Sequence, residues 1–167
     1  MDDDEREPVT LLHTLDSFGG TYVAMFLFAI VSGVFPLASS EAVMVALGAA
    51  SSYSVPKLIV LAAVTALGQS VTHASLYWSA RGLADAGAKR RPKLEARIAK
   101  ARELGARWEK SELLMIALGA TVGIPPQLLV ALLAGVIGIR FRTFVSIDFP
   151  GRVARFVTIV MAAYLAR

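Results

Sequence analysis

Three long runs of the sequence contain no Asp, Glu, Lys or Arg: Ser17 to Ser40, Leu58 to Ala80 and Leu113 to Ile139. A transmembrane helix needs about 20 consecutive apolar residues, and each run is long enough. A fourth apolar stretch extends from Phe156 to Ala166. The chain has 167 residues, of which 56% are apolar, and its mean hydropathy is +0.61. This clustering predicts a single-domain, all-α, multi-pass integral membrane protein.

Proline interrupts two of the apolar segments. Pro36 breaks the first, and the adjacent pair Pro125 and Pro126 breaks the third. Proline lacks a backbone donor and clashes with the preceding helical turn, so a helix ends or kinks there. Backbone groups freed at membrane depth must be buried in protein or face water. Both breaks therefore predict irregular backbone that lines an internal polar space.

The same order of segments occurs twice along the chain, a broken apolar segment followed by an unbroken one. Such a pattern is typical of transporters built from two inverted repeats around a central site. We predict two repeats, each a re-entrant helical hairpin followed by a transmembrane helix. A kinked helix that crosses the membrane once is the alternative for each broken segment. The predicted order is hairpin 17–55, helix 56–80, hairpin 112–141 and helix 142–167.

Residues 81–111 form a basic connector between the two repeats. Ten Lys or Arg and four Asp or Glu lie between Arg81 and Lys110. From Pro92 the composition favours a helix with a thin apolar stripe, which fits an anionic membrane face. A solvated connector is the alternative. Short loops rich in Lys and Arg stay on the cytoplasmic side, which predicts that this loop is cytoplasmic. We expect a multi-pass protein of the cell membrane. We do not interpret the basic charge as a sign of a nucleic-acid partner.

The N-terminal residues 1–16 are acidic where a cleaved signal peptide would be basic, so they predict a solvated tail. The chain contains no cysteine and two well-separated histidines, which disfavours a transition-metal site. It carries no zinc-protease helix, no phosphate-binding Gly-rich loop and no Gly-flanked nucleophilic serine. We therefore expect a protein that is not an enzyme and needs no metal or other cofactor.

Glu41 is the strongest single candidate for function. It follows the break at Pro36 inside an apolar segment. A carboxylate at the centre of a membrane helix costs about 2.5–3.5 kcal/mol, so it marks a functional site by default. The alternative is a structural role, in which Glu41 complements the N-terminal dipole of a helix that Ser39 or Ser40 caps. The two roles are compatible.

Arg152 and Arg155 are three residues apart and share one helix face. Two guanidiniums in a water-filled space suit a phosphate, because arginine binds it in a bidentate manner. Asp148 lies four residues before Arg152 but across Pro150, so regular helical pairing is not assured. Alternatively, the arginines extend to the membrane interface and Asp148 is their counter-ion.

Polar residues lie in the middle of segment 58–80, namely Gln69, Ser70, Thr72 and His73. We favour interhelical hydrogen bonds for them over a polar lining or a proton relay through His73. Small residues allow close helix approach, which we predict at Gly68, Gly119, Gly123 and Gly135. Aromatic residues at segment ends are predicted to anchor at the membrane interface, namely Tyr77, Trp78 and Trp108.

Four stretches together resemble the DedA family of membrane proteins, also called VTT-domain or SNARE-associated Golgi proteins, and its short YqaA-like branch. They are "SSEAVMVALGAA", "ALGQSVTHASLYWSARG", "IPPQLLVALLAGVIGIRFRTF" and "GRVARF". The resemblance covers most of the chain from about residue 33. It implies paired inverted re-entrant hairpins and movement of lipids such as phospholipids or undecaprenyl phosphate, with proton coupling in some members.

The resemblance also implies roles for individual residues. Glu41 matches the acidic residue of the first hairpin, and Pro125 lies in the second. Arg152 and Arg155 match the basic pattern of the last helix. Where better-studied members carry arginines around the second hairpin, this chain has the neutral Thr121 and Gln127. The basic role then falls on the two arginines of the last helix.

We expect a transporter or scramblase for an anionic lipid, with or without proton coupling. The predicted partners are lipids with anionic head groups, and a homo-oligomer is compatible with the pattern. A membrane scaffold that docks a cytoplasmic partner through the basic connector, and a proton-coupled exporter of small solutes, are the alternatives. The predicted binding residues are Glu41, Gln69, Gln127, Arg152 and Arg155.

Overall fold

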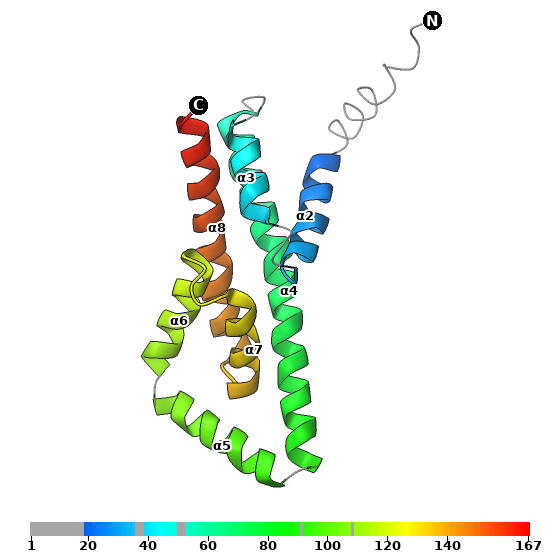
Figure 1. The fold of residues 1–167 in the computed structure, drawn as a ribbon, viewed down its shortest axis with the longest axis vertical. Helices are drawn as coiled ribbons and strands as arrows, with labels where there is room; N and C mark the ends of the chain where they lie inside the picture. Colours follow the sequence, from blue (N-terminus) through cyan, green and yellow to red (C-terminus); the bar gives the residue numbers. More distant parts are fainter. Residues whose placement is uncertain (1–18, 36–38, 50–52, 91, 108) are drawn as a thin grey trace, which may run out of the picture.

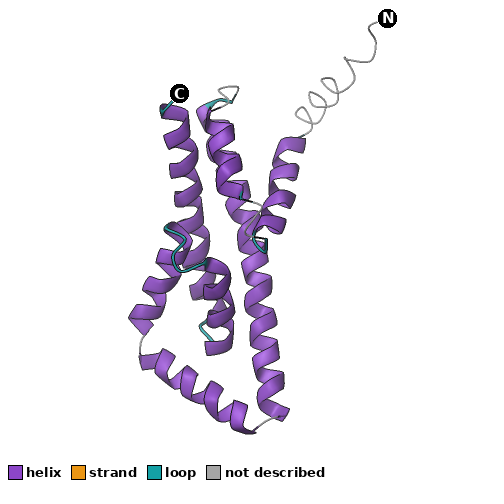
Figure 2. Cartoon of the chain, in the orientation of Figure 1, coloured by secondary structure: helices purple, strands orange, loops and turns teal. Residues whose placement is uncertain are grey.

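The computed structural model describes residues 19–35, 39–49, 53–90, 92–107 and 109–167, and every regular element in these ranges is a helix (Figure 2). The predicted acidic tail, Pro36 and Trp108 lie outside the described residues. The all-α prediction is confirmed for the described part of the chain. The helices are α2 (Gly20–Ser32), α3 (Ser40–Ala49), α4 (Val55–Arg90), α5 (Pro92–Arg107), α6 (Glu109–Thr121), α7 (Gln127–Ile137) and α8 (Phe141–Leu165).

Two long helices, α4 and α8, lie side by side and form the axis of the molecule (Figure 1). Helices α2 and α3 lie beside the half that contains the C-terminus, whereas α6 and α7 lie beside the other half. Helix α5 crosses the end opposite the C-terminus. Within the described residues, one helix is both long and apolar enough to cross a membrane, namely α4 over Val55–Gly87.

In each half of the chain, one short helix packs against α4 and the other packs against α8. In the first half α2 packs against α4 and α3 packs against α8; in the second half α6 packs against α8 and α7 packs against α4. Glycines make the close approaches. A Cβ at Gly48 would meet Val160 O and Ala163 Cβ, and a Cβ at Gly135 would meet Tyr77 O and Ala80 Cβ. In both contacts the two partner residues on the long helix are three positions apart.

Two apolar cores are separated along the molecule. On α4, residues 58–66 belong to the first core and Tyr77 to the second; on α8, Phe144 belongs to the second core and residues 156–160 to the first. Between them lie buried polar residues of both helices: Gln69, Ser70, Thr72 and His73 of α4, and Asp148 and Arg152 of α8. The two long helices therefore place a polar layer between the two cores, as the mid-segment polar residues of α4 led us to expect for that helix.

Helix α4 is longer than predicted, since it continues to Arg90 instead of ending at residue 80. Residues 81–90 are rich in helix formers such as Ala, Leu and Arg, and the next proline is Pro92, which opens α5. The predicted basic connector thus consists of the end of α4, all of α5 and the start of α6. The apolar run ends at Ala80, but the charged residues that follow do not end the helix.

The prediction of Tyr77 as an interface anchor is wrong. Its side chain is fully buried, and its hydroxyl donates a hydrogen bond to Ile139 O. Its ring packs on Phe141 and Phe144, with centroids 5.4 and 5.5 Å away. Trp78 is 53% exposed, as an anchor would be. Tyr77 instead fixes the start of α8 against α4, because a buried hydroxyl needs a partner.

Candidate functional site

Asp148 of α8 is the centre of a buried hydrogen-bond network. Its Oδ2 accepts from Ser70 Oγ at 2.9 Å, and its Oδ1 accepts from Gln127 Nε2 at 2.6 Å and from Arg152 Nε at 3.0 Å. The residue is 1% exposed. The prediction that Pro150 leaves helical pairing unassured is resolved, because α8 is continuous through Pro150 and the i, i+4 pair forms. Asp148 thereby joins α4, α7 and α8.

Arg152 extends the network into the first half of the chain. Its Nη1 donates to Gln69 Oε1, and Gln69 Nε2 donates to Ser32 Oγ of α2 at 3.2 Å. Ser32 Oγ lies 2.5 Å from Ser40 Oγ, at the start of α3. Arg152 is only 5% exposed. A buried charge is tolerated when it is paired and hydrogen-bonded, which explains why this guanidinium is held by both Asp148 and Gln69.

Glu41 and Arg155 form a second ion pair, 2.9 Å between Oε1 and Nη2, which is far more accessible. Their side chains are 36% and 25% exposed. Ser39 caps α3, because its Oγ accepts from the Ala42 N–H at 3.1 Å, while it also donates to Glu41 Oε2 at 3.2 Å. The capping role therefore belongs to Ser39. Glu41 is left to pair across the molecule with α8.

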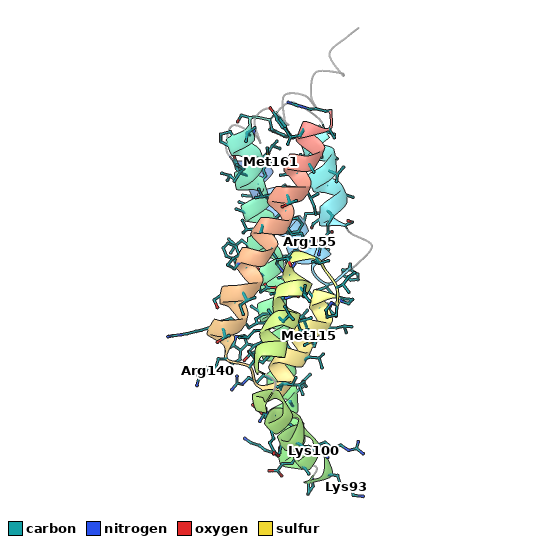
Figure 3. All side chains as sticks on the ribbon, turned by 90° about the vertical axis from the view of Figure 1, so that its left-hand side faces the viewer. Lys93, Lys100, Met115, Arg140, Arg155 and Met161 are labelled. Carbon is teal, nitrogen blue, oxygen red and sulfur yellow. The ribbon has the colours of Figure 1, made fainter. Side chains whose placement is uncertain are left out.

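A cavity of about 230 Å³ lies beside both ion pairs. Figure 3 places Arg155 between the level of Met161, toward the C-terminal end, and that of Met115. Three buried polar atoms of lining residues have no hydrogen-bond partner in the described structure: Arg152 Nη2, Gln127 Oε1 and His73 Nδ1. Buried polar groups are normally satisfied, so each of them marks a position for water or a ligand atom. The remaining lining includes Ser32, Ser39, Gly119, Gly123, Pro126 and Leu128.

Gly123 shapes the cavity where α6 ends. It has a left-handed φ of 85°, and its N–H donates to Leu118 O at 3.0 Å. A Cβ at this position would collide with the Arg155 guanidinium, and a Cβ at Gly119 would collide with Gln127 Oε1. We predicted close helix approach for both glycines. They instead make room for two side chains of the site.

The structure predicts opposite effects for alanine at two glycines. Gly123→Ala is expected to destabilise the protein by about 1–2 kcal/mol, because the left-handed backbone disfavours a Cβ. Arg155 must also move away from Glu41. Gly82→Ala is the control, since that helical position has open space, and it is expected to stabilise by about 0.5–1 kcal/mol. Thermal unfolding in detergent measures both, and equal midpoints would contradict the placement of Gly123.

The five predicted binding residues all line this one cavity. Glu41, Gln69, Gln127, Arg152 and Arg155 come from α3, α4, α7 and α8. Of the prolines, Pro126 is in the lining, Pro125 lies in the α6–α7 connection, and Pro36 is outside the described residues. Ser70 makes the interhelical bond that we favoured, as does Thr72, which donates to Ile30 O at 2.8 Å. His73 instead lines the cavity.

Sequence reasoning did not identify Ser32, Ser39 and Gly123 as parts of the cavity lining. Ser32 carried a usable signal, because it is a polar residue within an apolar run shortly before a proline break. Gly123 carried another, since it lies just before the second break. The residues they contact are distant in the chain, however. Ser32 accepts a hydrogen bond from Gln69, 37 residues later, and Gly123 lies against Arg155, 32 residues later.

Searches of curated proteins and of solved structures give no match. The family model for the VTT domain, which is the domain of the DedA family, matches residues 35–165. This range contains α3 to α8 and every residue of the polar cavity except Ser32, Gly33 and Val34. The chain therefore belongs to the VTT-domain family of DedA membrane proteins, as its motifs predicted.

Proposed function

We propose that the two broken segments are re-entrant hairpins and that the two halves form an inverted repeat. The hairpins α2–α3 and α6–α7 would enter from opposite sides, while α4 and α8 span the bilayer. The glycine contacts support this topology, since Gly48 of α3 packs against α8 and Gly135 of α7 packs against α4, each against two residues that are three positions apart. Helix α8 contains four charged residues, but it is 25 residues long, about 37 Å, which is enough to cross.

Single-cysteine labelling tests this topology in a chain that has no native cysteine. Lys100 and Arg140 are both exposed, on either side of the α6–α7 segment. If that segment is re-entrant, Lys100→Cys and Arg140→Cys react from the same side, which we expect to be the cytoplasm of a cell-membrane protein. Ser54→Cys should react from the opposite side. Labelling of positions 100 and 140 from opposite sides would show a kinked full span instead.

We further propose that the protein moves a lipid with an anionic phosphate head group across the bilayer. The main support for this proposal is the cavity beside Arg155. There the accessible Arg155–Glu41 pair adjoins the buried Arg152, whose Nη2 has no hydrogen-bond partner among the described residues. Arginine is the side chain best suited to phosphate. A cavity of about 230 Å³ is small for a whole lipid, so it would hold the head group alone.

Exchange of partners at Arg155 supplies a transport step. With no ligand, two guanidiniums and two carboxylates of the site balance in charge. A phosphate that enters would take Arg155 from Glu41, because its oxygens also accept bidentate hydrogen bonds. Glu41 would then face the water of the cavity. Return of Glu41 to Arg155 would release the phosphate, which couples lipid release to the state of Glu41.

Arg152 and Asp148 have a different role in this proposal. Asp148 already accepts three hydrogen bonds, and two of the three nitrogens of Arg152 have partners. They would hold α4, α7 and α8 in register and direct Arg152 Nη2 into the cavity. Arg155 would be the residue that binds and releases the head group, while Gln127 and His73 each have one buried polar atom without a partner that could contact it.

Reconstitution in phosphatidylcholine vesicles with a trace of fluorescent phosphatidylglycerol tests the transport proposal. We expect purified protein to expose the labelled lipid of the inner leaflet to a membrane-impermeant quencher. Arg155→Gln should slow this by about tenfold or more, because the phosphate loses its charged partner. Entry of inorganic phosphate into the vesicles would favour the solute exporter. Absence of any flux would favour the scaffold, with the exposed basic residues of α5 as its docking surface.

A further inference from the structure

Arg155 borders a second space besides the polar cavity, an open cleft of about 350 Å³ between α6 and α8. The cleft exists because α6 ends at Thr121, ahead of the Pro125–Pro126 break, whereas α8 continues to Leu165. At Gly151 the two helices touch, since a Cβ there would meet Ala120 Cβ. Beyond that contact α8 has no α6 beside it. The cleft is lined by Thr121, Val122, Ala154, Arg155, Thr158 and Ile159.

The walls of this cleft offer few free polar groups to a ligand. The two threonine hydroxyls in its lining both donate to the carbonyl four residues earlier in their own helix, Thr121 to Ala117 O at 2.7 Å and Thr158 to Ala154 O at 2.8 Å. Both hydroxyl protons are therefore already used in hydrogen bonds to the backbone and are not available to a ligand in the cleft. Val122 at the rim is 59% exposed. Arg155 is the charged residue of the lining, at the border with the polar cavity.

We propose that the cleft between α6 and α8 holds the hydrocarbon tail of the lipid whose head group Arg155 binds. This inference rests on the proposed function and adds the path of the tail. One guanidinium belongs to both spaces, so a head group in the polar cavity leaves its tail directly at the cleft. The ligand class is then an amphiphile with a phosphate head, and a free phosphate would fill only half of the site. The tail stays at the lipid-facing side while the head group passes through the polar layer.

Tryptophan substitution within the cleft tests the path of the tail. Ala154→Trp and Thr158→Trp fill the cleft from exposed positions of α8, so the fold tolerates them. We expect each to slow translocation of the fluorescent phosphatidylglycerol by about tenfold or more, because an indole that fills the cleft excludes the tail of a lipid whose head group lies at Arg155. The matched control is Ser75→Trp on α4. Ser75 is exposed, and its Oγ donates to Val71 O at 2.9 Å, as Thr158 does to Ala154 O, but it does not line the cleft.

A photoreactive phosphatidylglycerol with a diazirine near the end of its tail gives an independent readout. Crosslinks to residues 154–159 and 121–122 are expected, and Thr158→Trp should remove them. Wild-type rates in both Trp variants, with crosslinks elsewhere, would overturn the tail site. If Arg155→Gln is slow in that case, the proposed function stands and the tail site alone fails. If Arg155→Gln also translocates at the wild-type rate, the proposed function fails first.

Discussion

Asp148→Asn is expected to destabilise the protein by about 3–5 kcal/mol. Asp148 is the buried counter-ion of Arg152 and accepts three hydrogen bonds from three side chains. Removing one partner of a buried ion pair leaves the other charge uncompensated, and that desolvated charge determines the cost. Typical total stabilities are about 5–15 kcal/mol, so the loss is a large part of the whole. Thermal unfolding in detergent measures it.

An exposed ion pair of similar geometry is the control for this variant. Arg102 Nη2 lies 2.7 Å from Asp85 Oδ1, with side chains 39% and 49% exposed. Water screens the attraction in an exposed pair, so Asp85→Asn should change the unfolding midpoint little. The double variant Asp148→Asn with Arg152→Met should recover part of the loss, because it removes the unpaired charge. If Asp148→Asn unfolds at the wild-type midpoint, Arg152 is not a buried charge that depends on Asp148.

Much of the fold follows from the pattern of apolar runs and prolines. In lipid, the backbone N–H and C=O groups must be hydrogen-bonded within the protein, so apolar segments form helices. The second break is an example: the sequence predicts an interruption at Pro125 and Pro126, and α6 ends at Thr121 while α7 begins at Gln127. Hydropathy does not determine where a helix ends, because α4 continues past the last residue of the apolar run to Arg90. Nor does it separate an interfacial tyrosine from a buried one, since Tyr77 is fixed by contacts with distant residues of α8.

The sequence identifies the charged and amide residues of the candidate site, but not which of them contact one another. Charged and amide side chains in apolar segments are costly, which made Glu41, Gln69, Gln127 and both arginines visible. The sequence treats Arg152 and Arg155 alike, whereas the structure buries the first and pairs the second with Glu41. That difference arises from where α3 crosses α8. Such a crossing depends on the packing of Gly48 against Val160 and Ala163, residues more than 100 positions away.

Glu41→Gln and Ser39→Ala separate transport from helix capping at the start of α3. Ser39 makes the capping bond to the Ala42 N–H, so its loss should cost about 1 kcal/mol of stability. Glu41 lies in the first turn without making the cap. Its interaction with the helix dipole contributes about 0.3–1 kcal/mol, and an amide loses that charge. The stability effects of the two variants are therefore similar, and stability alone cannot tell the two roles apart.

Translocation does distinguish them, because only Glu41 alternates with the phosphate at Arg155. In Glu41→Gln no carboxylate returns to Arg155, so a bound head group leaves slowly, and we expect translocation at least about tenfold slower. Ser39→Ala removes one hydrogen bond to Glu41 Oε2 but leaves the charge, and should slow translocation far less. Equal loss in both variants would assign Glu41 to the structure of α3. A selective loss in Glu41→Gln would instead make it the residue that releases the lipid, which explains why a carboxylate lies beside an arginine at the break of an apolar segment.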